Sequence, residues 1–293
     1  MKLSFITDEA TQSFEEAVAF AGRLGFGGLE LRSVEEQPID RIAVHTLREW
    51  RNRLEAEGLA AACLSSTFFK CGFGDSDGPE MDKLSRLCDA ADILGCGLIR
   101  GFAFFRPEEG ALPADVLASR FEKPAVLLRA RGKRLLLEAD PSVNTANHAS
   151  LGALLDKLDR KCFGAVYDPG NNLFDPQREP PYPDGYDAIR PCLAHVHVKD
   201  AVLEPDGVPR CVAPGRGLVD WPRVLRRLSA DGYDGWLSIE PHYRKQAVLT
   251  EEQMRLPLGS RFTAGGMEAA RESGLALASL LAEMESEMRD GHT

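Results

Sequence analysis

The chain has 293 residues, and its 35 lysines and arginines against 45 aspartates and glutamates give a formal net charge of −10. Hydrophobic residues make up 44% and charged residues 27% of the sequence, which is typical of a globular protein and excludes intrinsic disorder. The negative charge disfavours nucleic acid as a partner, because phosphate binding needs clustered lysines and arginines. No apolar run approaches the roughly 18–20 residues of a membrane span, so we expect no membrane partner.

The cysteines and the N-terminus both bear on location. The seven cysteines are scattered and never form a Cys-x-x-Cys pair, which is typical of reduced cysteines in a protein core. The N-terminal segment reaches an acidic residue at Asp8, too early for a secretory signal peptide. Together these features predict a cytoplasmic protein.

Eight short apolar runs are spread along the whole chain. Their near-continuous hydrophobicity predicts parallel strands that are buried on both faces. We expect these strands at Leu3–Thr7, Gly28–Arg32, Ala60–Ser65, Leu98–Phe104, Arg134–Glu138, Gly164–Tyr167, Ala194–Val198 and Trp236–Glu240.

Amphipathic segments lie between these runs. In the first, apolar residues recur at helical spacing after Ser13, and Gly25 ends the pattern. Similar segments are Met81–Leu94, Pro113–Ala130, His148–Leu158, Trp221–Ala230 and Met267–Met288. Eight strands, each with room for a following helix, predict an α/β fold, a (β/α)₈ TIM barrel forming one domain over residues 1–293. No Gly-x-Gly-x-x-Gly motif follows the first strand, which argues against a dinucleotide-binding fold.

Ionisable residues stand at the ends of the last four predicted strands. In a barrel of this kind the carboxyl ends of the strands form the active-site mouth, so Glu138, Asp168, His197 and Glu240 are expected to converge there. Three carboxylates would repel one another unless a cation neutralised them. Three oxygen ligands and one imidazole suit one divalent metal ion, Mn²⁺ or Mg²⁺ first, with Co²⁺ or Zn²⁺ tolerated.

Other polar residues on the same strands and loops are candidates for substrate binding. They are Glu30, Arg32, Asn171, His195, Lys199, Arg216 and His242. His195 points to the same side of its strand as His197, and it is either a deeper supporting group or a hydrogen-bonded core histidine. The glycines on either side of Arg216 favour either a phosphate-binding loop or a tight turn. His45 and His148 lie in helical segments and are expected at the surface.

The predicted metal site indicates proton transfer next to a carbonyl group. Glu138 and Glu240 fit an acid/base pair by position, and the metal would stabilise an enediolate. Returning the proton elsewhere gives isomerisation or epimerisation of a sugar or sugar phosphate, whereas loss of a β-hydroxyl gives a keto-polyol dehydratase. A third hypothesis is that the barrel binds carbohydrate without catalysing a reaction.

The motifs around these residues resemble the xylose isomerase-like TIM-barrel family of sugar phosphate isomerases and epimerases. They are Leu-Leu-Leu-Glu138, Tyr-Asp168-Pro-Gly-Asn171, His195-Val-His197-Val-Lys-Asp200, Gly-Arg-Gly-Leu-Val-Asp220-Trp221 and Leu-Ser-Ile-Glu240. The resemblance implies one divalent metal bound by Glu138, Asp168, His197 and Glu240, with the two glutamates moving the proton. It also implies a sugar, keto-sugar or polyol substrate and is compatible with a homo-oligomer.

The chain departs from the family's ketose 3-epimerases at three positions. Those enzymes have Glu, His and Arg where this sequence has Asn144, Asn171 and Leu203. The departures argue against a free-ketohexose epimerase, and the His-x-His-x-Lys-Asp form is closer to the inosose dehydratase and unassigned isomerase branches.

Overall fold

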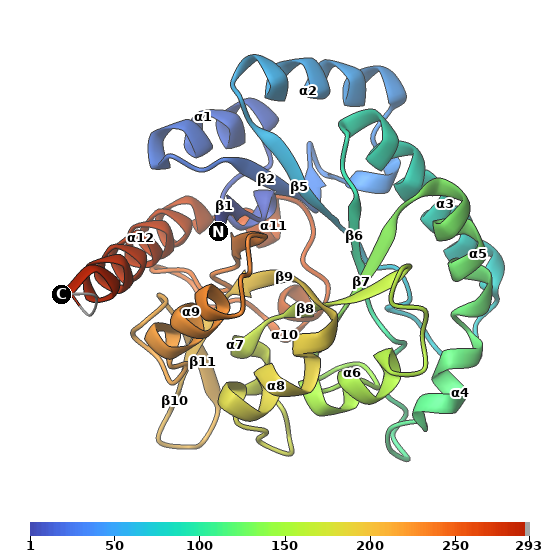
Figure 1. Ribbon diagram of the computed structural model, residues 1–293. Helices are drawn as coiled ribbons and strands as arrows, with labels where there is room; N and C mark the ends of the chain where they lie inside the picture. The colour runs from blue at the N-terminus through green and yellow to red at the C-terminus, as the bar shows by residue number, and fades with distance from the viewer. Residues whose placement is uncertain (291–293) are drawn as a thin grey trace.

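The computed structural model describes residues 1–290 and contains eight parallel strands that curve into a barrel (Figure 1). The hydrogen-bonded order is β1-β12-β9-β8-β7-β6-β5-β2, and a parallel bridge between Ile6 and Glu30 joins the two edges. The strands are β1 (Lys2–Phe5), β2 (Gly28–Leu31), β5 (Ala60–Ser65), β6 (Leu98–Gly101), β7 (Arg134–Glu138), β8 (Phe163–Tyr167), β9 (Leu193–Val198) and β12 (Trp236–Ile239). The predicted (β/α)₈ barrel is therefore confirmed.

Every predicted strand is present, and no strand end differs from the prediction by more than three residues. The largest difference is at β6, which ends at Gly101 rather than Phe104. Beyond Gly101 the backbone turns toward the loop after β5, where the amide groups of Phe102 and Phe104 donate to the carbonyl groups of Phe68 and Phe69. The apolar run Leu98–Phe104 therefore includes both strand β6 and the start of the buried loop that follows it, which is why the predicted strand is too long.

The longer helices surround the strands on the outside of the barrel (Figure 1). The described residues form twelve α-helices in all. They are α1 (Phe14–Leu24), α2 (Val44–Ala56), α3 (Asp77–Leu94), α4 (Ala114–Ser119), α5 (Glu122–Arg131), α6 (His148–Leu155), α7 (Pro169–Asn172), α8 (Tyr186–Ile189), α9 (Trp221–Ala230), α10 (Glu251–Arg255), α11 (Gly259–Thr263) and α12 (Gly266–Asp290). In α1, the Ser13 hydroxyl accepts the amide of Glu16, and Gly25 at φ 68° ends the helix in the left-handed conformation that favours glycine.

The predicted helix at Pro113–Ala130 is wrong in one respect, because the structure has two helices there. α4 ends before Arg120, and α5 begins at Glu122. Pro124 has no N–H to donate to the Arg120 carbonyl, so a continuous helix would lose that hydrogen bond. The predicted final helix is confirmed as α12, which packs against α9 and β12.

Several connections at the carboxyl ends of the strands are longer than a simple turn. A hairpin of β3 (Ser33–Val34) and β4 (Gln37–Pro38) follows β2, and a hairpin of β10 (Asp200–Leu203) and β11 (Pro209–Val212) follows β9. The segment after β12 includes α10, which appears within the ring of strands in the view of Figure 1. Among residues 1–290, no helix has both the length and the apolar character needed to cross a bilayer.

Candidate metal centre

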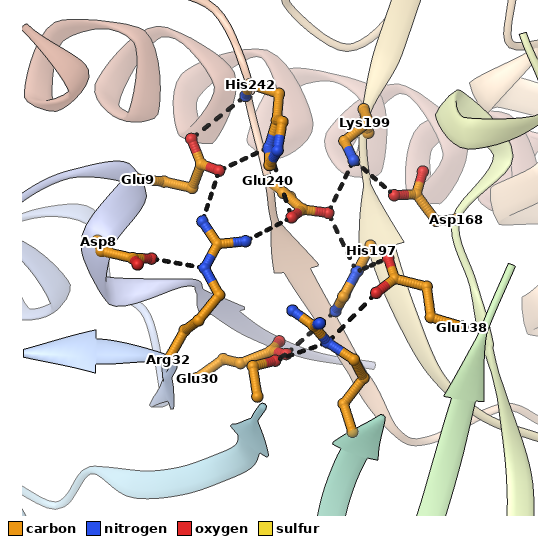
Figure 2. Close-up of polar contacts among 12 residues, drawn as sticks. Asp8, Glu9, Glu30, Arg32, Glu138, Asp168, His197, Lys199, Glu240 and His242 are labelled. Carbon is orange, nitrogen blue, oxygen red and sulfur yellow. Dashed lines mark hydrogen bonds and ion pairs between the residues drawn. The ribbon is translucent and has the colours of Figure 1, made fainter. Parts of the chain in front are cut away.

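The four residues predicted as metal ligands meet at the carboxyl ends of their strands (Figure 2). Glu138 ends β7, Asp168 follows β8, His197 lies on β9, and Glu240 follows β12. Each offers one ligand atom, and these atoms all lie within 4.8 Å of one another. All four side chains are buried, so water screens their charges poorly.

His197 is held between carboxylates on both sides of its ring. Its Nδ1 atom lies 3.0 Å from Oε1 of Glu138 and 3.2 Å from Oε2 of Glu240, and its Nε2 atom lies 3.1 Å from Oε1 of Glu30. Burial disfavours a charged imidazole, but the three carboxylates together raise the pKa of His197 well above its usual range. The distances show that Nδ1 is the ring atom that faces the other predicted ligands, Glu138 and Glu240.

A lysine lies where a cation is needed between two of the carboxylates. Nζ of Lys199 is 2.9 Å from Oδ2 of Asp168 and 2.9 Å from Oε2 of Glu240. Neither oxygen accepts a hydrogen bond of regular geometry, so these contacts are electrostatic only. Burial raises the pKa of Asp168 to about 7 despite the opposing charge of Lys199. Two buried carboxylate oxygens therefore retain lone pairs that a metal ion would use.

The charge balance around the site also fits a divalent cation. Five buried carboxylates are connected there by ion pairs to four buried cationic side chains, and Glu30 joins this network through its contacts with His195 and His197. Counting the histidines as neutral, six carboxylates and four cations leave two excess negative charges. The carboxylates are Asp8, Glu9, Glu30, Glu138, Asp168 and Glu240, and the cations are Arg32, Arg100, Lys199 and Arg244. In the metal-free site the raised pKa values of His197 and Asp168 retain protons that offset this excess charge. A divalent ion would take the place of those protons, and three carboxylates with one imidazole are a suitable donor set for it.

Glu30 and His195, predicted to bind substrate, lie deeper in the barrel than the four ligand residues. Nε2 of His195 is 2.7 Å from Oε2 of Glu30, and the Ser65 hydroxyl donates to Oε1 of the same carboxylate. Both residues are completely buried, and neither lines the cavity at the mouth of the barrel. The structure therefore gives them contacts to His197 and to each other rather than to the cavity.

The remaining predicted substrate-binding residues divide into two groups. Arg32, Asn171, Lys199 and His242 line a cavity of about 1260 Å³ that also reaches Glu138 and Glu240. Arg216 does not line it, because its side chain is 70% exposed and forms an ion pair with Glu272.

The glycine-flanked loop around Arg216 is a tight turn rather than an open anion site. The backbone amides of Gly215 and Gly217 donate to Oδ2 of Asp200, at 2.9 and 3.0 Å, and the amide of Val219 donates to Oδ1. The Asp200 carboxylate thus takes the N–H groups that a phosphate would need.

His148 was expected at the surface, and this expectation is wrong. The residue opens α6, but its ring is completely buried and lies 5.0 Å, centroid to centroid, from the ring of Tyr167. Burial lowers the pKa of His148 to about 4, so the ring is neutral at pH 7. His45 is exposed, as expected.

Several charged residues of the site were missed by the sequence analysis. Nε of Arg100, on β6, lies 3.2 Å from Oε2 of Glu138. Asp8 and Glu9 form ion pairs with Arg32, which in turn holds Oε1 of Glu240 at 2.8 Å. Asp8 and Glu9 follow the first predicted strand, Leu3–Thr7, so the criterion of ionisable residues at strand ends applies to them too.

Comparisons with known proteins agree with this architecture. Among solved structures, the probable 3-DHS dehydratase AsbF of Bacillus anthracis is 19% identical with a TM-score of 0.70, covering 92% of this chain and 98% of the other. An L-ribulose 3-epimerase is 14% identical with a TM-score of 0.72, covering 100% and 98%. The IOLI protein with a bound zinc atom is 14% identical with a TM-score of 0.71, covering 97% and 99%. These likenesses show the fold.

No curated protein matches the chain. The family model for the xylose isomerase-like TIM barrel matches residues 18–259. The matched region runs from α1 to α11 and includes Glu138, Asp168, His197 and Glu240. On this match, the chain belongs to the xylose isomerase-like TIM-barrel family.

Proposed function

We propose that the chain is a divalent-metal-dependent enzyme that isomerises or epimerises a keto-sugar or sugar phosphate through an enediolate. The observation that carries the proposal is the convergence of Glu138, Asp168, His197 and Glu240, whose ligand atoms lie within 4.8 Å of one another. The fold neighbours described as an L-ribulose 3-epimerase and a probable 3-DHS dehydratase support small polyhydroxylated substrates. The seven free cysteines support a cytoplasmic location.

Glu138, Asp168, His197 and Glu240 would hold the metal through three carboxylates and Nδ1 of the imidazole. Such oxygen-rich sites suit Mn²⁺ or Mg²⁺, and the neighbour with a bound zinc atom supports Zn²⁺ as an alternative. When bound, the ion supplies Lewis acidity that polarises the substrate carbonyl and acidifies the adjacent C–H bond.

Glu138 and Glu240 would move the proton. Burial raises the pKa of Glu138, but Arg100 and His197 together lower it more. Burial acts in the same direction on Glu240, and Lys199 together with His242 and His197 keeps its pKa well below its usual range. Both carboxylates are therefore ionised at pH 7 and available as bases. One glutamate takes the proton from the carbon next to the carbonyl group. The C–H electron pair becomes the C=C bond of the enediolate, and the carbonyl π pair moves to the carbonyl oxygen. Return of a proton to the neighbouring carbon isomerises the substrate, and return to the opposite face of the same carbon epimerises it.

Dehydration of a keto-polyol is the second candidate, and the positions of two asparagines favour it over ketohexose epimerisation. The Asn144 amide donates to the carbonyl groups of residues 103–105 and lies outside the cavity lining. Asn171 donates to the Ala139 carbonyl and accepts from Lys199, so it supplies no additional base. From the same enediolate, expulsion of a β-hydroxyl with a proton from a protonated glutamate would release water.

The first test of the proposal is titration of metal-stripped protein with Mn²⁺ by calorimetry. We expect binding near one ion per chain in the wild type and loss of this binding in the variant Glu138→Gln/Glu240→Gln. Unchanged binding in the double variant would show that the ligand assignment is wrong. Glu80→Gln, which alters a buried glutamate on α3, is the control for general effects of removing a carboxylate.

The second test separates the reactions. Manganese-loaded protein is incubated with ketoses and inososes in D₂O, and the molecular masses of the products are measured by mass spectrometry. Incorporation of deuterium without loss of mass indicates isomerisation or epimerisation, and loss of one water indicates dehydration. If Glu240→Gln folds normally and retains full turnover, the assigned base is wrong. Tight ligand binding without exchange in any substrate would support a carbohydrate-binding barrel.

A further inference from the structure

The cavity at the mouth of the barrel is larger than a monosaccharide site requires. Its volume of about 1260 Å³ exceeds the roughly 300–1,000 Å³ that is typical of pockets for drug-sized ligands. The residues of the proposed catalytic centre lie at one end of it. A keto-sugar at the metal centre would therefore leave the other end of the cavity empty.

The two ends of the cavity differ in chemistry. The inner end is polar and buried, and it presents Glu138, Asn171, Lys199 and Glu240. The outer end is formed by the β10–β11 hairpin and by the segment of residues 246–258, and we call it the apolar rim. Its apolar side chains include Val208, Val248, Leu249, Met254, Leu256, Pro257 and Leu258.

The apolar rim exposes side chains that usually avoid water. Twelve large apolar residues in the part of the chain that the structure describes are exposed, and four of them belong to the rim. Val248 is 93% exposed and Val208 is 57% exposed. Single exposed apolar residues are ordinary, but a cluster at the entrance of a ligand cavity marks a surface that a partner covers.

The rim is a built structure that crosses the mouth. The guanidinium carbon of Arg255 lies 4.2 Å from the ring centroid of Phe105, which belongs to the loop after β6. The Thr250 hydroxyl and the Gln253 side chain cap α10 reciprocally, and Gln253 also donates to the Arg261 carbonyl. These contacts keep the apolar side chains beside the cavity that Glu138 and Glu240 also line.

We propose that the substrate has two parts, a polyhydroxylated keto part at the metal centre and an apolar aryl or alkyl substituent that contacts the apolar rim. The inference rests on the proposed function for the first part and on the cavity for the second. It names a substrate class, sugars carrying an aryl or alkyl group, instead of free sugars. Burying the substituent would cover the exposed valine and leucine side chains, and each buried apolar group strengthens binding.

The test compares matched ligands on manganese-loaded protein by calorimetry. The probes are the methyl and phenyl glycosides of the 3-keto forms of glucose, galactose and mannose, which carry the carbonyl group of the proposed substrate and differ only in the substituent within each pair. For at least one sugar we expect the phenyl glycoside to bind about tenfold more tightly or better, with a more negative heat-capacity change. The variant Val248→Asn/Leu256→Asn should lose this preference. The control variant Val126→Asn/Leu275→Asn, which alters exposed residues on α5 and α12, should keep it.

Two outcomes would overturn the inference. One is equal affinity for methyl and phenyl glycosides, or no measurable binding of any phenyl glycoside at millimolar concentration. The other is a phenyl preference that survives in Val248→Asn/Leu256→Asn. Manganese affinity is measured on the same samples, because failure of the proposed function would abolish metal binding in the wild type. Failure of the present inference would leave metal binding intact and remove only the preference for the substituent.

Discussion

Glu30 and His197 form a buried contact that fixes which nitrogen of the histidine faces the other candidate metal ligands. Oε1 of Glu30 lies 3.1 Å from Nε2 of His197, while Nδ1 of the same ring faces Glu138 and Glu240. A carboxylate behind a histidine ligand favours a proton on the far nitrogen and a lone pair on the near one. Glu30 is therefore expected to act on the metal through His197.

The first prediction concerns Glu30→Gln. The amide keeps the shape of the side chain but removes the charge that orients His197, so we expect Mn²⁺ affinity to fall by about 10–100-fold. Calorimetric titration at pH 7 measures the change. Glu80→Gln removes a different buried carboxylate, one that pairs with Lys83, and should leave the affinity unaltered. A well-folded Glu30→Gln protein with wild-type affinity would contradict the orienting role.

The second prediction concerns Lys199, whose ammonium group neutralises Asp168 and Glu240. Removing one partner of a buried ion pair typically destabilises a protein by about 3–5 kcal/mol, so Lys199→Met should unfold at lower denaturant concentration without metal. A metal ion would neutralise the same carboxylates. We therefore expect Mn²⁺ to stabilise the variant more than it stabilises the wild type, as measured by urea unfolding with and without the ion.

Lys70→Met is the matched control for this experiment. Nζ of Lys70 is 2.9 Å from Oδ2 of Asp140, and its side chain is as buried as that of Lys199, at 4% exposure. Lys70→Met should also lower stability, but the additional stabilisation by Mn²⁺ should match that of the wild type. An equal response of both variants to Mn²⁺ would mean that Lys199 and the metal do not share the same carboxylates.

The candidate metal ligands could be predicted from sequence because each follows or ends an apolar strand. In a closed parallel barrel all strands end at the same mouth, so position along the chain translates into position in space. The same argument, applied to the first strand, would have included Asp8 and Glu9. Arg100 was harder to identify, because it interrupts an apolar run that continues to Phe104 and has no motif of its own.

Features that depend on the packing of side chains were not predictable in this way. A histidine at the start of a helix has the same local pattern whether it faces solvent or the barrel, and only the structure shows that His148 packs on Tyr167. The apolar rim has no periodicity, because Val248 and Leu256 lie in irregular chain on either side of the short helix α10. Arg216 was suggested by glycines that serve instead to bring backbone amides to Asp200.

The third prediction uses the pH dependence of stability. His148 has a pKa of about 4 in the folded protein and about 6.5 when unfolded, because burial disfavours its charge, and Glu179 at 3.8 Å does not offset this. As pH falls below 6.5 the unfolded chain binds a proton that the folded chain does not. The contribution of His148 to the free energy of unfolding is thus complete above pH 6.5. It falls by up to about 1.4 kcal/mol per pH unit toward pH 4.

His148→Phe should reduce this slope between pH 6.5 and pH 4, because the phenyl ring can pack on Tyr167 and does not titrate. Urea unfolding at several pH values measures the difference between variant and wild type, which cancels the titration of other groups. His45→Phe is the control, since His45 is exposed. Identical slopes for wild type and His148→Phe would mean that the buried ring is already protonated in the fold.

The last prediction concerns Asp200, whose carboxylate accepts the backbone amides of Ala201, Gly215, Gly217 and Val219 at 2.9–3.1 Å. Asp200→Ala leaves these amides without an acceptor. The amides of Ala201 and Val219 are buried, and each unsatisfied buried group costs about 1–3 kcal/mol, so we expect a loss of about 2–6 kcal/mol in urea unfolding. Asp220→Ala, which removes only a half-exposed cap of α9, should cost about 1 kcal/mol. If both variants lost the same small amount, the loop would be held by its glycine conformations rather than by the carboxylate.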